Sequence, residues 1–155
     1  MILTTMPGRF GDILWALPTV RAISETVGEP VDLAISGKYG SIAPLIEEQE
    51  YIRKVLVLEQ WEIVESAPMR PIQAPGDFSS YERVISLGYP GWPTVPLPHY
   101  VHLIARLVFP QILPLDLDRP WIRSAPSIPC AQPVVAVGFT DEWFELKGGL
   151  WSLLW

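Results

Sequence analysis

The sequence is poor in cysteine and in basic residues, and it contains no long apolar run. Cys130 is the single cysteine among 155 residues, so no internal disulfide can form and a reducing compartment is expected. The net charge of -6 gives no basic footprint, which argues against a nucleic-acid partner. No uninterrupted apolar run reaches about 18 residues, so no transmembrane segment is expected. Residues 1–5 lack the basic region of a signal peptide, and a cytoplasmic protein is predicted.

The residues that are present indicate a globular protein with a substantial core. Hydrophobic residues make up 49% of the chain and charged residues 18%, a balance that argues against disorder. The length suits one full domain and is too short for two. Most of the 17 prolines fall between Pro68 and Pro133, which predicts short elements and many loops in the second half.

Apolar runs alternate with longer amphipathic segments along the first 110 residues. Four strands are predicted, at Ile2–Met6, Val31–Ser36, Lys54–Leu58 and Arg83–Leu87, of which the first and the fourth are expected to be buried. Three helices are predicted, at Asp12–Val27, Ser41–Gln49 and Pro98–Phe109, with Pro18 expected to kink or restart the first. Residues 61–64 suit one helical turn, and residues 116–123 have extended character. The alternation predicts an α/β fold with a Rossmann-like parallel sheet flanked by helices.

The loop after the first strand carries the strongest functional signal. In such sheets ligands bind at the carboxyl ends of the strands, and Gly8 and Gly11 allow close approach of the backbone. The spacing is neither G-x-G-x-x-G nor a P-loop, which disfavours a nicotinamide enzyme and an NTPase. Arg9 suits a phosphate or carboxylate, or is simply a solvated loop residue.

Asp12 allows two interpretations. As a helix N-cap it would satisfy a backbone donor, and as a general base it would accept a proton from a sugar hydroxyl. Both hold together only if the side chain leaves the cap when substrate arrives.

Histidine, tryptophan and cysteine are the other residue types that could carry chemistry. His99 and His102 stand three apart on a predicted helix, but no acidic or cysteine partner has matching spacing, so no metal is expected. His99 is instead predicted to line an acceptor cleft. Trp92, in the loop after the fourth strand, offers a flat face for a sugar ring, whereas Cys130 has no nearby base and is no nucleophile.

The segment from Arg9 to Ile23 resembles the opening motif of glycosyltransferase family 9, the heptosyltransferases of lipopolysaccharide synthesis and their relatives. The shared features are Gly11-Asp12, an apolar helical turn, Pro18 and an apolar continuation. The resemblance continues through residues 31–35, 52–58 and 81–87, and it covers roughly the first 90 residues.

This resemblance implies the two-domain GT-B fold, with an N-terminal acceptor domain and a C-terminal domain for the nucleotide-sugar. It implies Asp12 as catalytic base. With that function, Gly8, Arg9 and Gly11 are expected to bind the acceptor because of their place in the loop after the first strand. Trp92 and His99 are expected to do so because of their place in or beside the loop after the fourth strand. The resemblance also implies transfer of a sugar to a glycan or lipopolysaccharide-type acceptor without metal or cofactor. A peripheral contact with the inner face of the cell membrane is left open.

The family's organisation divides the chain at its proline-rich stretch. Residues 1–124 correspond to the acceptor domain, 125–133 to a linker, and 134–155 to the first strand and helix start of a truncated second domain. Thr140 and Lys147 are the expected donor contacts, although Gly148-Gly149 replaces the family's aromatic and proline. The chain alone is therefore expected to be inactive. Its apolar residues 150–155 are expected to pack on a missing domain or to self-associate.

Two other functions stay open at the level of sequence. A non-catalytic Rossmann-like binding module would keep the scaffold without transfer activity, since a fold does not fix a function. The second of these alternatives is a different Rossmann-like enzyme that acts on a phosphorylated small molecule.

Overall fold

A computed structural model describes residues 1–59, 61, 74–88 and 95–123. Their elements, in chain order, are β1 (Ile2–Met6), α1 (Phe10–Val27), β2 (Val31–Ser36), the 3₁₀ helix η1 (Gly37–Ile42), α2 (Ala43–Glu47), β3 (Ile52–Leu58), β4 (Arg83–Ser86) and α3 (Leu97–Val108). The described residues all belong to one compact unit within Met1–Ala125. The predicted linker and second domain lie outside them.

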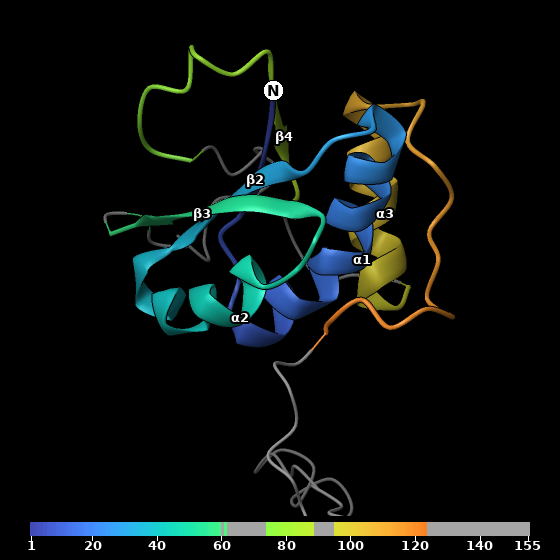
Figure 1. The fold of residues 1–155 in the computed structure, drawn as a ribbon, viewed down its shortest axis with the longest axis horizontal. Coiled ribbons are helices and arrows are strands. Elements are labelled where there is room, and N and C mark those ends of the chain that lie inside the picture. The colour runs from blue at the N-terminus through green and yellow to red at the C-terminus, as the bar shows by residue number, and fades with distance from the viewer. Residues whose placement is uncertain (60, 62–73, 89–94, 124–155) are drawn as a thin grey trace, which may run out of the picture. The chain divides into compact units, whose positions relative to one another are not determined.

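The four strands form one sheet with the order β3-β2-β1-β4, and every pairing is parallel. The chain therefore steps from β1 through β2 to β3 on one side and then returns to place β4 on the other side of β1 (Figure 1). This confirms an α/β fold with a parallel sheet flanked by helices. It is compatible with a Rossmann-like arrangement.

Apolar residues on the two faces of the sheet belong to two separate hydrophobic clusters. The larger cluster joins one face to α1 and α3, and Ile2 and Met6 of β1 both belong to it. Leu3, between them in sequence, points the other way and packs with Ala34 and Trp61 in the smaller cluster. This division follows from the two-residue period of a strand. The central strands β1 and β2 are buried at every position, whereas β3 and β4, at the ends of the strand order, are partly exposed. Of the predicted buried strand Arg83–Leu87, only Ile85 and Leu87 are buried, because β4 has a described neighbour on one side alone.

Helix α1 is continuous across Pro18, so the expectation that this proline restarts the helix is wrong. The ribbon of α1 instead changes direction along its course (Figure 1), as expected where a proline removes one backbone donor. Gly28 ends the helix in the left-handed conformation, with φ of 77°, and donates its N–H to the carbonyl of Ser24. The prediction that Gly28 closes the helix is thereby confirmed.

Other boundaries shift by a few residues. The predicted helix at Ser41–Gln49 is wrong in its start and its type, because the segment begins as η1 at Gly37 and becomes the short helix α2 only at Ala43. Strand β3 begins two residues earlier than expected, and β4 ends one residue earlier. Among the described helices, none is long and apolar enough to cross a membrane.

Residues 112–123, named the strap, follow α3 without regular secondary structure and run along α1 (Figure 1), with contacts from Leu113 on Thr26 to Trp121 on Trp15. The buried guanidinium of Arg21 fastens the strap by donating to the carbonyls of Asp116, Arg119 and Pro120 at 2.5, 3.3 and 3.1 Å. The amide of Gln49 holds the far end, because it accepts from the N–H of Arg123 and donates to its carbonyl. Backbone groups of an irregular segment are in this way paired by side chains.

A buried carboxylate ties the outer strand β3 to the chain that precedes β4. Asp32 of β2 is 1% exposed and accepts hydrogen bonds from Arg53 Nε at 2.8 Å and from Tyr81 Oη at 2.5 Å. Burial raises the pKa of the Asp32 carboxyl, but the hydrogen bonds of Arg53 and Tyr81 and the charges of Arg53 and Lys54 outweigh it and hold the pKa below 3.8. The ionised form of Asp32 therefore stabilises the fold.

We expect Asp32→Asn to lower the free energy of unfolding at pH 7 by about 1–3 kcal/mol, because Arg53 and Tyr81 lose a buried, charged acceptor. A carboxyl whose pKa is depressed in the folded state contributes stability above its unfolded pKa, and this contribution is lost as the pH falls. The difference between wild type and variant should therefore shrink below pH 3.8. Urea unfolding at pH 7 and pH 3 measures both. The exposed Asp118→Asn is the control, and an equal loss in that variant would contradict the assignment.

Candidate functional site

Successive strands are added to one side of β1 as far as β3, and β4 is then added to its other side. The candidate site lies at this reversal of strand order, at the carboxyl ends of β1 and β4. Ligands of parallel sheets bind at such a switch point, where the loops of neighbouring strands separate. The chain leaves β1 through buried Pro7 and Gly8 and enters α1 at Phe10. It leaves β4 through Leu87, whose N–H donates to the carbonyl of Thr5 at 2.8 Å. The predicted loop therefore lies at the edge where a ligand is expected.

Asp12 occupies the third position of α1, so its prediction as the N-cap residue is wrong. Arg9 is the N-cap, and its backbone N–H donates to Asp12 Oδ2 at 2.8 Å. The carboxylate thus reaches back toward the start of the helix, in one half of a capping box. Asp12 has an ordinary structural role, and it is also held at the edge where chemistry is expected.

Gly8 leaves the space that the side chain of Asp12 occupies. A Cβ at residue 8 would lie 2.2 Å from the Cβ of Asp12 and 2.8 Å from its Oδ2, so no side chain fits there. A Cβ at Gly11 would meet nothing within 4 Å. The expected role of both glycines as ligand contacts is untested, but the structure gives Gly8 a packing reason and gives Gly11 none.

Two further predicted acceptor residues lie within the described chain. Arg9 is exposed at the entrance to α1. His99 is exposed in the first turn of α3. Because α3 follows β4, its first turn is expected near the same edge as the start of α1.

His102 lies one turn further along α3 and is buried. Its Nδ1 has no hydrogen-bond partner within the described residues. Burial lowers the pKa of the His102 imidazole, and the nearby charges of Arg106 and His99 lower it further. The described residues contain no cluster of three or more potential metal ligands.

Trp92, Thr140 and Lys147 lie outside the described residues.

An aromatic pair that sequence reasoning missed stands at the same edge. The ring of Phe10 meets the ring of Tyr39 edge to face, with centroids 5.2 Å apart. Tyr39 belongs to η1, which follows β2, and the ammonium of Lys38 lies 5.8 Å from the Tyr39 ring centroid. Ligands of a parallel sheet bind at the carboxyl ends of its strands, and the second strand was predicted to end at Ser36. Lys38 and Tyr39, which follow it, were therefore within reach of a prediction from sequence.

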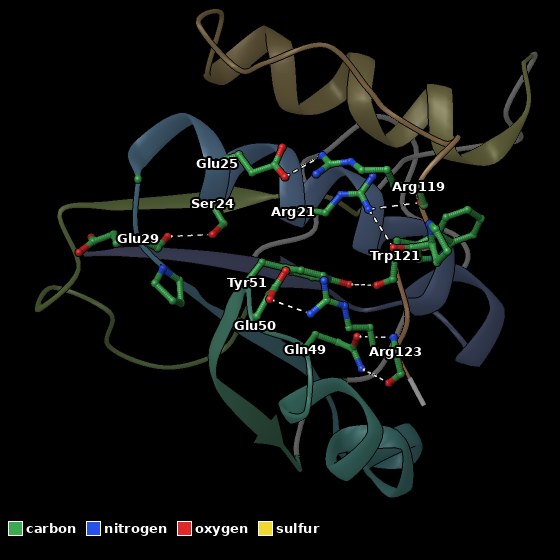
Figure 2. Close-up of a pocket in the computed structure, with 13 residues that line it drawn as sticks. Arg21, Ser24, Glu25, Glu29, Gln49, Glu50, Tyr51, Arg119, Trp121 and Arg123 are labelled. Carbon is green, nitrogen blue, oxygen red and sulfur yellow. Dashed lines mark hydrogen bonds and ion pairs between the residues drawn. The ribbon is translucent and has the colours of Figure 1, made fainter. Parts of the chain in front are cut away.

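A pocket of about 530 Å³ lies at the opposite, amino edge of the sheet, away from the predicted site. Figure 2 shows its walls, which come from the end of α1, the residues before β2 and β3, and the strap. Its charged side chains meet in pairs, with Arg119 on Glu25 at 2.8 Å and Arg123 on Glu50 at 2.9 Å. Tyr51 donates its hydroxyl to the carbonyl of Trp121, and burial raises the pKa of that phenol well above its usual value. These contacts serve the strap.

The two glycines of the loop give a matched pair of substitutions. We expect Gly8→Ala to lower the free energy of unfolding by about 1–3 kcal/mol, because its methyl group displaces the Asp12 side chain. Gly11→Ala should be neutral or stabilise by up to about 1 kcal/mol, since it adds a better helix former in open space. Urea unfolding compares them, and equal effects of the two would contradict the packing role of Gly8.

No protein-family model, no curated protein and no solved structure matches this chain. The function must therefore be inferred from the residues of this chain and from their geometry.

Proposed function

We propose that this chain is the acceptor-side domain of a GT-B glycosyltransferase that transfers a sugar from a nucleotide-sugar to a glycan or lipopolysaccharide-type acceptor. The observation that carries the proposal is the position of Asp12. Its carboxylate is oriented by the backbone of Arg9 in the first turn of α1, at the carboxyl end of β1 and at the switch point of a parallel sheet. The resemblance of residues 9–23 to the family motif supports the same residue.

In the proposed reaction Asp12 accepts the proton of an acceptor hydroxyl. The freed oxygen attacks the anomeric carbon of the donor sugar, and the bond to the nucleotide diphosphate breaks as the new glycosidic bond forms. The hydrogen bond from Arg9 N–H keeps the carboxylate in one orientation, which lowers the cost of positioning it in the transition state.

The donor side of the proposed reaction lies outside the described residues. Thr140 and Lys147 are its proposed contacts, in a second domain that begins near residue 134. Basic side chains and helix N-termini would neutralise the diphosphate as it leaves. In this proposal, transfer requires these donor contacts as well as Asp12.

One observation favours a non-catalytic binding module instead. The contact between Arg9 N–H and Asp12 Oδ2 is an ordinary capping contact and fully explains an acidic residue at this position. Such a module would bind sugars or nucleotides without turnover. A substitution that keeps the cap but removes the base separates these two functions.

Asp12→Asn makes that separation. Its amide oxygen can still accept from Arg9 N–H, but it cannot take a proton, so we expect kcat to fall by about 10²–10⁴-fold with little change in melting temperature. Transfer of the sugar from a radiolabelled nucleotide-sugar is measured with the protein that the natural gene encodes. Asp77→Asn, on an exposed segment, is the matched control. Full turnover by Asp12→Asn would remove Asp12 from the mechanism.

A further inference from the structure

The aromatic pair at the carboxyl edge joins two neighbouring strands. Phe10 opens α1 directly after β1, and Tyr39 lies in η1 directly after β2. These strands are paired as far as Met6 and Ile35, so their exits are adjacent. The edge-to-face contact of the two rings therefore spans the loops of both strands.

The two rings differ in what they offer to solvent. Tyr39 is half-buried, its ring meets Phe10, and the ammonium of Lys38 lies over it. Phe10 is 44% exposed, which leaves much of a large apolar ring in water. Phe10 is thus the open surface and Tyr39 its support.

The support is fixed by close packing on both sides of Tyr39. A Cβ at Gly37 would lie 2.7 Å from the Cα of Glu59, and a Cβ at Gly40 would lie 2.7 Å from Cγ1 of Val57. Only glycine lets η1 lie this close to the end of β3. The Tyr39 ring therefore rests on a tightly packed segment, and a ligand that uses the pair loses little freedom in ordering it.

We propose that Phe10, supported by Tyr39, binds the apolar face of a sugar ring in the acceptor. The C–H groups on one face of a pyranose can cover the ring and remove its apolar surface from water, while the hydroxyls stay hydrated. Arg9 precedes Phe10 in the chain, and the ammonium of Lys38 lies over the Tyr39 ring. Both charged residues are exposed, so the aromatic surface has polar neighbours. Such surroundings suit a small polar ligand better than a broad protein interface. The assignment of the sugar as acceptor rests on the proposed function; the stacking does not.

Ligand-observed NMR tests the stacking directly, with methyl β-D-glucopyranoside and methyl α-D-mannopyranoside as probes. Saturation of aromatic protons should transfer to the C–H protons of one sugar face in wild type and in Phe10→Tyr. The transfer should fall at least about threefold in Phe10→Ala. Phe78→Ala, which removes a ring paired with Tyr81 at 6.3 Å, is the matched control and should keep it. Absence of transfer in wild type, an unchanged signal in Phe10→Ala or an equal loss in Phe78→Ala would overturn the proposal.

Kinetics separate this inference from the proposed function. In the transfer assay Phe10→Ala should raise the acceptor KM about three- to tenfold with kcat nearly unchanged, whereas Asp12→Asn should lower kcat. Stacking without any transfer would overturn the glycosyltransferase and keep the stacking site. Transfer that depends on Asp12 while Phe10→Ala leaves KM unchanged would overturn the assignment of the stacked sugar as the acceptor and keep the glycosyltransferase.

Discussion

The contact between Gly8 and the side chain of Asp12 sets where α1 begins, and the candidate site depends on it. Because residue 8 has no side chain, the carboxylate of Asp12 can fold back over the loop and accept from Arg9 N–H. The first helical residue is then Phe10, which places its ring where η1 carries Tyr39. One missing Cβ thus connects the end of β1, the start of α1 and the aromatic pair.

The side chains at the amino and carboxyl edges of the sheet differ in what they contact. At the amino edge, Arg21, Gln49 and Tyr51 pair with backbone groups of the strap, which an irregular segment could not pair by itself. The pocket there is lined by groups that already hold structure together. At the carboxyl edge a large apolar ring is left in water beside charged residues. A pocket whose polar groups are already paired within the protein offers few of them to a ligand.

Much of this fold follows from local pattern, whereas the site depends on contacts that the pattern does not contain. Apolar runs located all four described strands, and Gly28 marked the end of α1, because strand burial and a left-handed helix end are local properties. Asp12 was misplaced as the N-cap because an acidic residue suits the first and the fourth positions of a capping box alike. Its true position depends on the path of the backbone at Gly8. The pairing of Phe10 with Tyr39 joins residues in different loops, and only the strand order brings them together.

The geometry of α1 also restricts how an acceptor could reach both Phe10 and Asp12. Successive helical residues are turned by about 100°, so these two side chains, two positions apart, leave the helix in directions about 160° apart. A sugar lying along one flank of α1 would meet one of them and miss the other. A single acceptor can contact both only by lying across the N-terminal end of the helix, over the loop from Gly8 to Arg9. The carboxylate of Asp12 points toward that end, because its hydrogen bond is to Arg9 N–H. An end-on approach is also the one that a ligand at the carboxyl edge of the sheet would take.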